Sequence, residues 1–213
     1  MSLLPVFLRL ERRPVLVVGA GTVAQSKLQS LRSTGAVITV VAPDAAPAIL
    51  DLAAAGAFLW RQRTFRPSDL DGIFLVIAAT NDSAVNHSIY EEALRRNVLC
   101  NAVDDPPNCD FYFGSVVARG DLQIAISTAG ESPALAQRLR REIDEQLPQD
   151  LGPWLHELGA LRQQIRGTAP AGPARNLLLH ELAQRHLCSS TECPTRQYAA
   201  EQIAVLRNVE VPA

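Results

Sequence analysis

The chain has 213 residues, of which 47% are hydrophobic and 20% are charged, a composition typical of globular proteins and unlike that of disordered or fibrous chains. Its 20 basic and 22 acidic residues leave a formal net charge of -2, which argues against a large surface for nucleic acid or anionic lipid. No apolar run reaches the length of a membrane span, and the first residues lack the pattern of a secretory signal. We therefore expect a cytoplasmic protein with no nucleic-acid or membrane partner.

The first 112 residues alternate short apolar runs with helical patterns, as in a parallel sheet that is covered by crossover helices. The apolar runs predict strands at 15–18, 37–41, 58–60, 73–78 and 98–100. Helical patterns lie between them at about 22–33, 44–55 and 83–96. We therefore predict an α/β domain over residues 1–112, a Rossmann-type parallel sheet with helices on both faces.

The pattern changes after the proline pair at 106–107. Residues 114–118 and 122–127 predict an antiparallel hairpin, and Ser132-Pro133 is typical of a helix start. We expect this strand-strand-helix element, residues 113–149, to be too small to fold alone. Residues 150–213 predict a helical carboxyl-terminal domain, with helices at about 151–165, 175–187 and 194–207.

A glycine-rich loop, Gly19-Ala20-Gly21-Thr22-Val23-Ala24, follows the first predicted strand and opens a helix. Gly19 allows a tight turn, Gly21 lets a pyrophosphate approach the backbone, and the free amides of the helix start attract the anion. We predict a dinucleotide site that includes Gly19, Gly21, Thr22 and Val23. The alternative is a purely structural turn.

The end of the second predicted strand reads Val41-Ala42-Pro43-Asp44. An acidic residue here usually binds the adenosine ribose, so Pro43 and Asp44 are candidate cofactor residues. Asp44 stands a few positions late and could equally begin the next helix. Because no basic residue awaits a 2'-phosphate, the sequence favours NAD over NADP.

Small and polar residues follow the strand that ends at Ala78. Ala79 and Thr80 fall at the carboxyl edge of the predicted sheet, where ligands of open parallel sheets bind. We include both residues in the cofactor site. The alternative is an ordinary turn with an Asn or Asp helix cap at residues 81–82.

Asp104 is the candidate catalytic residue. It follows the last predicted strand of the sheet and should project into the crevice of the glycine loop. A carboxylate beside a nicotinamide can take up a proton while hydride leaves, and a neighbouring acid such as Asp105 would raise its pKa toward neutrality. The alternative is that Asp104, Asp105 and Asp110 are turn residues around the prolines.

Metal binding and thiol chemistry receive little support. The four cysteines include no CxxC pair, so we expect reduced thiols. His180, His186, Cys188 and Cys193 match no established zinc spacing. We therefore predict no metal site.

Several motifs, far apart in the chain but in a fixed order, resemble one enzyme family. They are Leu4-Pro5-Val6-Phe7, the glycine loop with Lys27, Ala78-Ala79-Thr80 with Asn86, Cys100-Asn101-Ala102-Val103-Asp104, Phe111, and Ser127-Thr128-Ala129-Gly130-Glu131-Ser132-Pro133. Over about residues 1–150 the chain resembles precorrin-2 dehydrogenase, the amino-terminal module of siroheme synthase.

This resemblance implies oxidation of precorrin-2 to sirohydrochlorin with NAD, Asp104 as the residue that removes a proton, and an intertwined homodimer formed through residues 113–147. Some members also act as sirohydrochlorin ferrochelatases, which leaves ferrous iron open as a further substrate. The tetrapyrrole substrate carries many carboxylates, which Arg138, Arg140 and Arg141 could neutralise. The candidate substrate-binding residues are Thr128, Arg138 and Arg141. The arginines could equally be the solvated helix face, paired with Glu142 and Asp144.

Two residues depart from the family pattern, since Thr128 stands where many relatives have serine and Asp105 where a small residue is common.

Two rival hypotheses for the function remain open. A non-enzymatic NAD-sensing module would have the same fold, and a chelatase with a decayed dinucleotide site would insert iron without binding NAD.

Overall fold

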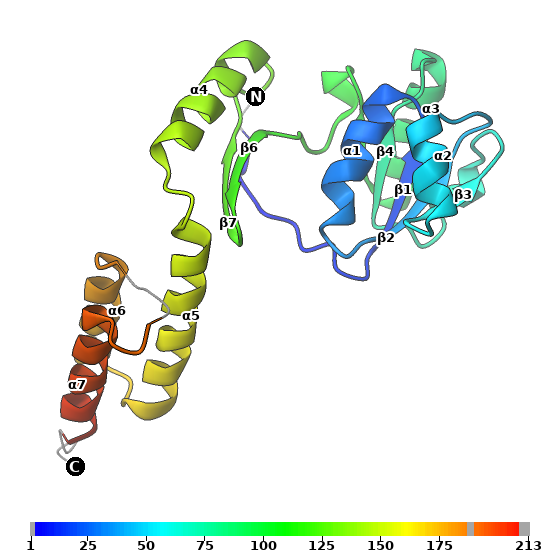
Figure 1. The fold of residues 1–213 in the computed structure, drawn as a ribbon. Helices are drawn as coiled ribbons and strands as arrows, with labels where there is room; N and C mark the ends of the chain where they lie inside the picture. The colour runs from blue at the N-terminus through cyan, green and yellow to red at the C-terminus, as the bar shows by residue number, and fades with distance from the viewer. Residues whose placement is uncertain (1–2, 187–189, 209–213) are drawn as a thin grey trace. The chain divides into compact units, whose positions relative to one another are not determined.

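The computed structural model of the chain describes residues 3–186 and 190–208. The chain forms two compact units, Met1–Phe113 and Gly114–Ala213, which are drawn in Figure 1. The first unit holds the predicted glycine loop and Asp104, and the second holds the predicted hairpin and the later helices.

The first unit is built on a five-stranded parallel sheet with the strand order β3-β2-β1-β4-β5. Its strands are β1 (Pro14–Val18), β2 (Val37–Val41), β3 (Leu59–Arg61), β4 (Leu75–Ala78) and β5 (Leu99–Ala102). The last residue of β1, Val18, pairs with Val41 on one side and with Ala78 on the other. The strand order reverses between β1 and β4, and open sheets of this kind bind ligands beyond the carboxyl ends of the strands at such a point.

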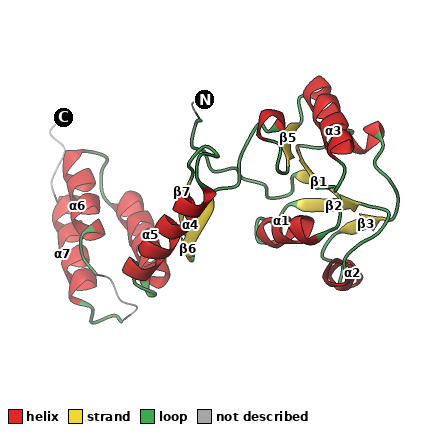
Figure 2. Cartoon of the chain, turned by 90° about the horizontal axis from the view of Figure 1, so that it is seen from above, coloured by secondary structure: helices red, strands yellow, loops and turns green. Residues whose placement is uncertain are grey.

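Three helices cover both faces of the sheet, as the sequence predicts. They are α1 (Thr22–Arg32), α2 (Pro47–Ala54) and α3 (Ser83–Arg96). Figure 2 shows α1 and α2 on one face and α3 on the other. Val15 and Val17 of β1 are buried against the first face, whereas Leu16 and Val18 are buried in the core that contains α3. Because successive side chains of a strand point to opposite faces, a strand buried on both faces must be apolar throughout.

A buried carboxylate fixes the chain after β3. Asp69, in the short 3-10 helix η1 (Pro67–Leu70), has a side chain that is only 1% exposed. It accepts hydrogen bonds from Arg63 at 2.5 and 2.7 Å, from Arg61 at 3.1 Å and from the backbone N–H of Arg66 at 2.9 Å. The hydrogen bonds from Arg63 are the largest cause of the lowered pKa of Asp69. This cluster holds in place the loop that carries Thr64 and Phe65.

We expect Asp69→Asn to lower the free energy of unfolding at pH 7 by about 2 kcal/mol, because two guanidiniums lose the buried charge that they neutralise. Since the folded-state pKa lies below the unfolded value, this contribution is present above about pH 4 and disappears as the pH falls through the folded pKa. Urea unfolding followed by circular dichroism should therefore show a gap between wild type and variant that closes in acid. The control is Asp71→Asn, because Asp71 is 67% exposed in its pair with Arg96 and should change stability by less than about 1 kcal/mol.

The second unit begins with the predicted hairpin. Strands β6 (Ser115–Arg119) and β7 (Leu122–Ile126) pair in antiparallel fashion, and helix α4 (Pro133–Gln146) packs on them. Ser132 caps α4, as predicted, by accepting a hydrogen bond from the backbone N–H of Leu135 at 3.2 Å. The hairpin prediction is confirmed.

The described part of the second unit contains three further helices, as the sequence predicts. They are α5 (Leu151–Thr168), α6 (Pro173–Ala183) and α7 (Pro194–Asn208). They pack together around Leu161, Ile165, Leu182 and Ile203. Helix α6 ends four residues before the predicted end at 187, and residue 187 itself lies outside the described residues. None of the described helices is long and apolar enough to cross a bilayer. The domain boundary at 149/150 stays a prediction.

Candidate functional site

The glycine loop lies against the loop that follows β4. Gly19 has φ +101°, and a Cβ at this position would lie 2.3 Å from the carbonyl oxygen of Ala79. The Gly19 N–H also donates a hydrogen bond to the carbonyl of Val41 at 2.9 Å. Only glycine fits a backbone with this φ and this close approach. The ends of β1, β2 and β4 are therefore locked together at Gly19.

The start of α1 is suited to an anion. Gly21 is the residue before the helix, has no side-chain cap, and no acidic residue stands in the first turn. The first N–H groups of a helix have no partner within the helix, and the helix dipole adds positive potential there. A Cβ on Gly21 would meet nothing within 4 Å. This open space beside free amides fits the pyrophosphate of a dinucleotide.

A cavity of about 760 Å³ lies at the carboxyl edge of the sheet, within the size range of small-molecule sites. It is lined by seven of the eight predicted cofactor residues, namely Gly19, Gly21, Thr22, Pro43, Asp44, Ala79 and Thr80. Thr64 and Phe65 also line it, and sequence reasoning missed both because the strand before them is short. The eighth residue, Val23, lines the adjacent pocket described below.

The structure contradicts one interpretation of Asp44, namely that it begins the next helix. Helix α2 begins at Pro47, not at the predicted residue 44, with Ala46 as its capping residue. Proline fixes φ at a helical value and favours the first helical position. Asp44 is exposed in the loop before the helix and lines the cavity.

The loop after β4 is clamped by a buried side chain. Asn86 of α3 is 5% exposed. Its side chain accepts hydrogen bonds from the Thr80 N–H at 3.1 Å and the Thr80 hydroxyl at 2.7 Å, and donates one to the Thr80 carbonyl at 3.1 Å. Asp82 caps α3 through the N–H groups of Ala84 and Val85, as the turn alternative predicts. The segment therefore is a capped turn and also lines the cavity.

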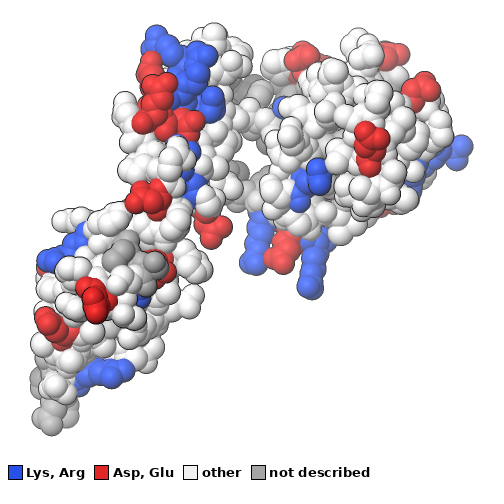
Figure 3. Space-filling model, viewed as in Figure 1, with Lys and Arg blue, Asp and Glu red and all other residues white. Residues whose placement is uncertain are grey.

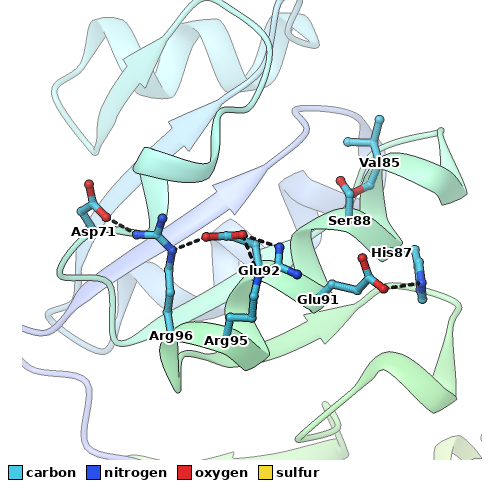
Figure 4. A network of polar contacts seen from close by, with 8 residues as sticks. All are labelled: Asp71, Val85, His87, Ser88, Glu91, Glu92, Arg95 and Arg96. Atoms are coloured by element: carbon cyan, nitrogen blue, oxygen red, sulfur yellow. Dashed lines mark hydrogen bonds and ion pairs between the residues drawn. The ribbon is translucent and has the colours of Figure 1, made fainter.

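Helix α3 is tied down at its other end by an ionic network, drawn in Figure 4. Glu92 pairs with both Arg95 and Arg96, and Arg96 also pairs with Asp71, just after η1. The hydrogen bond from Arg95 is the largest cause of the lowered pKa of Glu92. The helix is thus fixed at its last turn, while its first turns carry Val85 and Ser88, which line the large cavity.

A second pocket of about 400 Å³ brings Asp104 to the glycine loop. It is lined by Gly21, Thr22 and Val23 from the start of α1, by Ala79, Thr80, Asn81, Ser83 and Asn86 from the β4–α3 region, and by Val103, Asp104 and Asp105 after β5. The two pockets share five lining residues, which are Gly21, Thr22, Ala79, Thr80 and Asn81. A ligand on the glycine loop can therefore extend toward the Asp104 carboxylate.

The segment that carries Asp104 is held by the chain that returns after it. Asn101 is 7% exposed and donates hydrogen bonds to the carbonyl of Phe111 at 2.8 Å and to the sulfur of Cys109 at 3.4 Å. Asp104 itself is exposed and has φ +60°, a left-handed conformation that Asp and Asn tolerate better than most residues. The anchored turn presents its carboxylate to the pocket.

The neighbouring acids have structural partners. Asp110 accepts a hydrogen bond from the backbone N–H of Cys100 at 2.9 Å. Asp105 accepts one from the Asn108 side chain at 2.6 Å. For these two residues the contacts match the turn interpretation. The Asp104 carboxylate, in contrast, accepts no hydrogen bond from the described residues and lines the pocket.

The predicted substrate residues belong to the second unit. The Thr128 hydroxyl accepts a hydrogen bond from the Ser132 N–H at 3.2 Å. Arg138 pairs with Glu142 at 3.2 Å, and Arg140 pairs with Asp144 at 3.6 Å. Figure 3 shows basic and acidic side chains mixed over α4. The arginine pairs match the alternative of a solvated helix face, and a role in substrate binding stays a prediction.

The histidines and cysteines of the second unit form no metal centre that the structure describes. Cys188 lies outside the described residues. The Nε2 atom of His186 lies 3.7 Å from the Oδ2 atom of Asp150. Within residues 3–186 and 190–208, no three His, Cys, Asp or Glu side chains are grouped closely enough to hold a metal ion.

Comparison with known proteins agrees with this geometry. Residues 6–115 match the family model described as "Putative NAD(P)-binding". The chain belongs to this family. Residues 119–146 match a second model, described as "Sirohaem biosynthesis protein central". The boundary between the two models falls near the boundary between the two units.

Two kinds of relative support the resemblance seen in the sequence. "Siroheme synthase 1" of Cronobacter sakazakii is 45% identical over 77% of this chain, and "Siroheme synthase" of Zymomonas mobilis is 42% identical over 83%. This chain spans 35% and 38% of those two proteins. The solved structure of "SirC, precorrin-2 dehydrogenase" has a TM-score of 0.76 and 27% identity, and the match covers 95% of this chain and 100% of that one. The resemblance to precorrin-2 dehydrogenases and the predicted fold class are confirmed.

Proposed function

We propose that the chain oxidises precorrin-2 to sirohydrochlorin with NAD, as a step of siroheme biosynthesis. The observation that carries the proposal is the pocket that Asp104 shares with Gly21, Thr22 and Val23. The siroheme synthase relatives and the precorrin-2 dehydrogenase structure support the same assignment.

The residues of the site match the parts of such an oxidation. Oxidation of the macrocycle removes a hydride and a proton, and NAD, when bound, accepts the hydride. Gly21 and the free amides at the start of α1 bind the pyrophosphate, and Asp44 binds at the adenosine end of the cavity. Asp104 accepts the proton, because its carboxylate lies in the adjoining pocket and none of the described residues donates a hydrogen bond to it.

We further propose that Thr128, Arg138 and Arg141 contribute to tetrapyrrole binding. Arg141 has no ion pair among the described residues, and Arg138 is paired only with an exposed Glu142. An exposed pair of this type contributes little stability, so a substrate carboxylate can replace Glu142 at low cost.

We also propose that the chain is a cytoplasmic homodimer joined through the hairpin and α4. The hairpin is a sheet of only two strands, which is marginal by itself. Val116 and Leu135 are 46% and 39% exposed, apolar surface that a second copy would bury. Light scattering on the purified chain should give twice the mass of one chain. A single-chain mass at micromolar concentration would contradict the dimer.

The activity is tested by an anaerobic absorbance assay with precorrin-2 and NAD, repeated with ferrous iron. We expect NADH to appear together with sirohydrochlorin, in equal amounts. The arm with iron shows whether the product is also metallated. NAD binding without any oxidation of precorrin-2 would favour the sensing module, and iron insertion without NAD binding would favour the chelatase.

A further inference from the structure

One cation beside the Asp104 pocket differs in chemical type from all others in the protein. Of the 20 lysine and arginine residues, Lys27 is the only lysine. It lies on α1, one helical turn after Val23, which lines the pocket. Residues four apart lie on the same face of a helix, so Lys27 stands on the side of α1 that faces this pocket.

The Lys27 ammonium is held by an aromatic ring and not by a carboxylate. Its Nζ lies 4.1 Å from the centroid of the Phe113 ring, and Phe113 in turn packs on Phe111 with a centroid distance of 5.6 Å. Among the residues that the structure describes, no acidic oxygen lies within 4 Å of Lys27. The side chain is half-buried. The ammonium is therefore partly removed from water without a partner of opposite charge.

The charged groups around Lys27 are those of the candidate site. Burial lowers the pKa of Lys27, and the nearby Asp104 and Cys109 partly oppose this change. Asp104 lines the same pocket as Val23. Apart from the Phe113 ring, the compensation that the described residues provide comes chiefly from the negative charge of Asp104, which forms no ion pair with Lys27.

A half-buried cation without an ion pair is costly, and such groups are concentrated where a ligand supplies the missing charge. We propose that Lys27 binds a carboxylate of the tetrapyrrole beside Asp104, and so orients the macrocycle for oxidation. This inference rests on the proposed function. A lysine suits the task because its compact charge on a flexible stem reaches one carboxylate oxygen in a narrow space, whereas arginine needs room for a planar fork.

A purely structural role is the competing explanation. The contact between Lys27 and Phe113 could serve only to hold residues 111–113 in place, with a contribution of the size usual for a cation on an aromatic face. In that case the loss of Lys27 would lower the thermal stability. Tetrapyrrole affinity would then fall only because part of the protein is misfolded.

The test compares Lys27→Met and Lys27→Arg with wild type, and uses Arg32→Met as a matched control. Methionine keeps the apolar length of lysine without its charge. Arg32 is exposed on the last turn of the same helix. For each protein we would measure the Kd of sirohydrochlorin by absorbance titration, the Kd of NAD, the thermal midpoint, and the KM and kcat for precorrin-2.

We expect Lys27→Met to raise the Kd of sirohydrochlorin and the KM for precorrin-2 by about tenfold or more, the effect of losing a charge-assisted hydrogen bond. The Kd of NAD should not change. Lys27→Arg should recover part of the loss, and Arg32→Met should behave as wild type. Unchanged tetrapyrrole affinity in a folded Lys27→Met protein would overturn the inference, as would an equal loss in Arg32→Met.

Failure of the inference can be told apart from failure of the proposed function. If wild type oxidises precorrin-2 and Lys27→Met does so with the same KM, only the role of Lys27 is wrong. If wild type does not oxidise precorrin-2 but binds sirohydrochlorin through Lys27, only the proposed activity is wrong. If wild type binds no tetrapyrrole, both are wrong.

Discussion

Asp104→Asn is expected to lower the rate of precorrin-2 oxidation by about 10²–10⁴-fold, the usual contribution of a positioned general base. Asparagine has the same shape but cannot take up the proton. It also tolerates the left-handed backbone at position 104, where φ is +60°. NAD affinity should change little, because Asp104 does not line the large cavity, where we propose that the adenosine and pyrophosphate parts of the cofactor bind.

The measurement is single-turnover oxidation of precorrin-2 under anaerobic conditions, with NAD binding followed separately. Asp105→Asn is the matched control, because Asp105 is the adjacent acid and its carboxylate is bonded to Asn108. A change of less than about threefold is expected there. Oxidation of precorrin-2 by Asp104→Asn at the wild-type rate would contradict the role of Asp104 as the base. An equal fall in rate in Asp104→Asn and Asp105→Asn would show that the conformation of the turn matters and not the Asp104 carboxylate itself.

Gly21→Asp is expected to raise the Kd of NAD by about 100-fold or more, because one substitution places both bulk and negative charge where the pyrophosphate binds. A Cβ at Gly21 meets no protein atom within 4 Å, so the variant should fold. Its φ of -86° is also open to any residue. The loss therefore reports on the ligand and not on the backbone.

Isothermal titration with NAD measures the effect. Ser26→Asp adds the same charge to an exposed position one turn further along α1 and should change the Kd by less than about threefold. Wild-type NAD affinity in a folded Gly21→Asp protein would be incompatible with binding at the glycine loop.

The sheet of the first unit could be predicted from the sequence because its physical signal is strong. β1 and β4 are buried on both faces and therefore consist of unbroken apolar runs. The glycine loop was equally clear, since Gly19 is required by its φ and by the carbonyl of Ala79. The order of strands and loops also predicted the position of Asp104 after β5, where it lines a pocket with the glycine loop.

Features that depend on distant contacts could not be predicted in this way. The start of α2 at Pro47 was missed because the acidic Asp44 is also a good first residue for a helix. The Asp69 cluster joins residues from a short strand and the following loop, and no sequence pattern marks it. Lys27 was noted as part of a motif, but its contact with Phe113 spans most of the first unit's sequence. Besides its place in the motif, Lys27 is distinguished in the sequence by being the only lysine.

The central claim is that NAD, the macrocycle and Asp104 meet in one hollow at the carboxyl edge of the sheet. The most direct measurement is a crystal structure of the Asp104→Asn protein with NAD and precorrin-2, prepared without oxygen. We expect the nicotinamide ring to lie against the macrocycle, in the space between Gly21 and residue 104, with the introduced amide side chain within hydrogen-bond distance of the macrocycle. A macrocycle bound elsewhere, or a residue 104 turned to bulk water with both ligands in place, would contradict it.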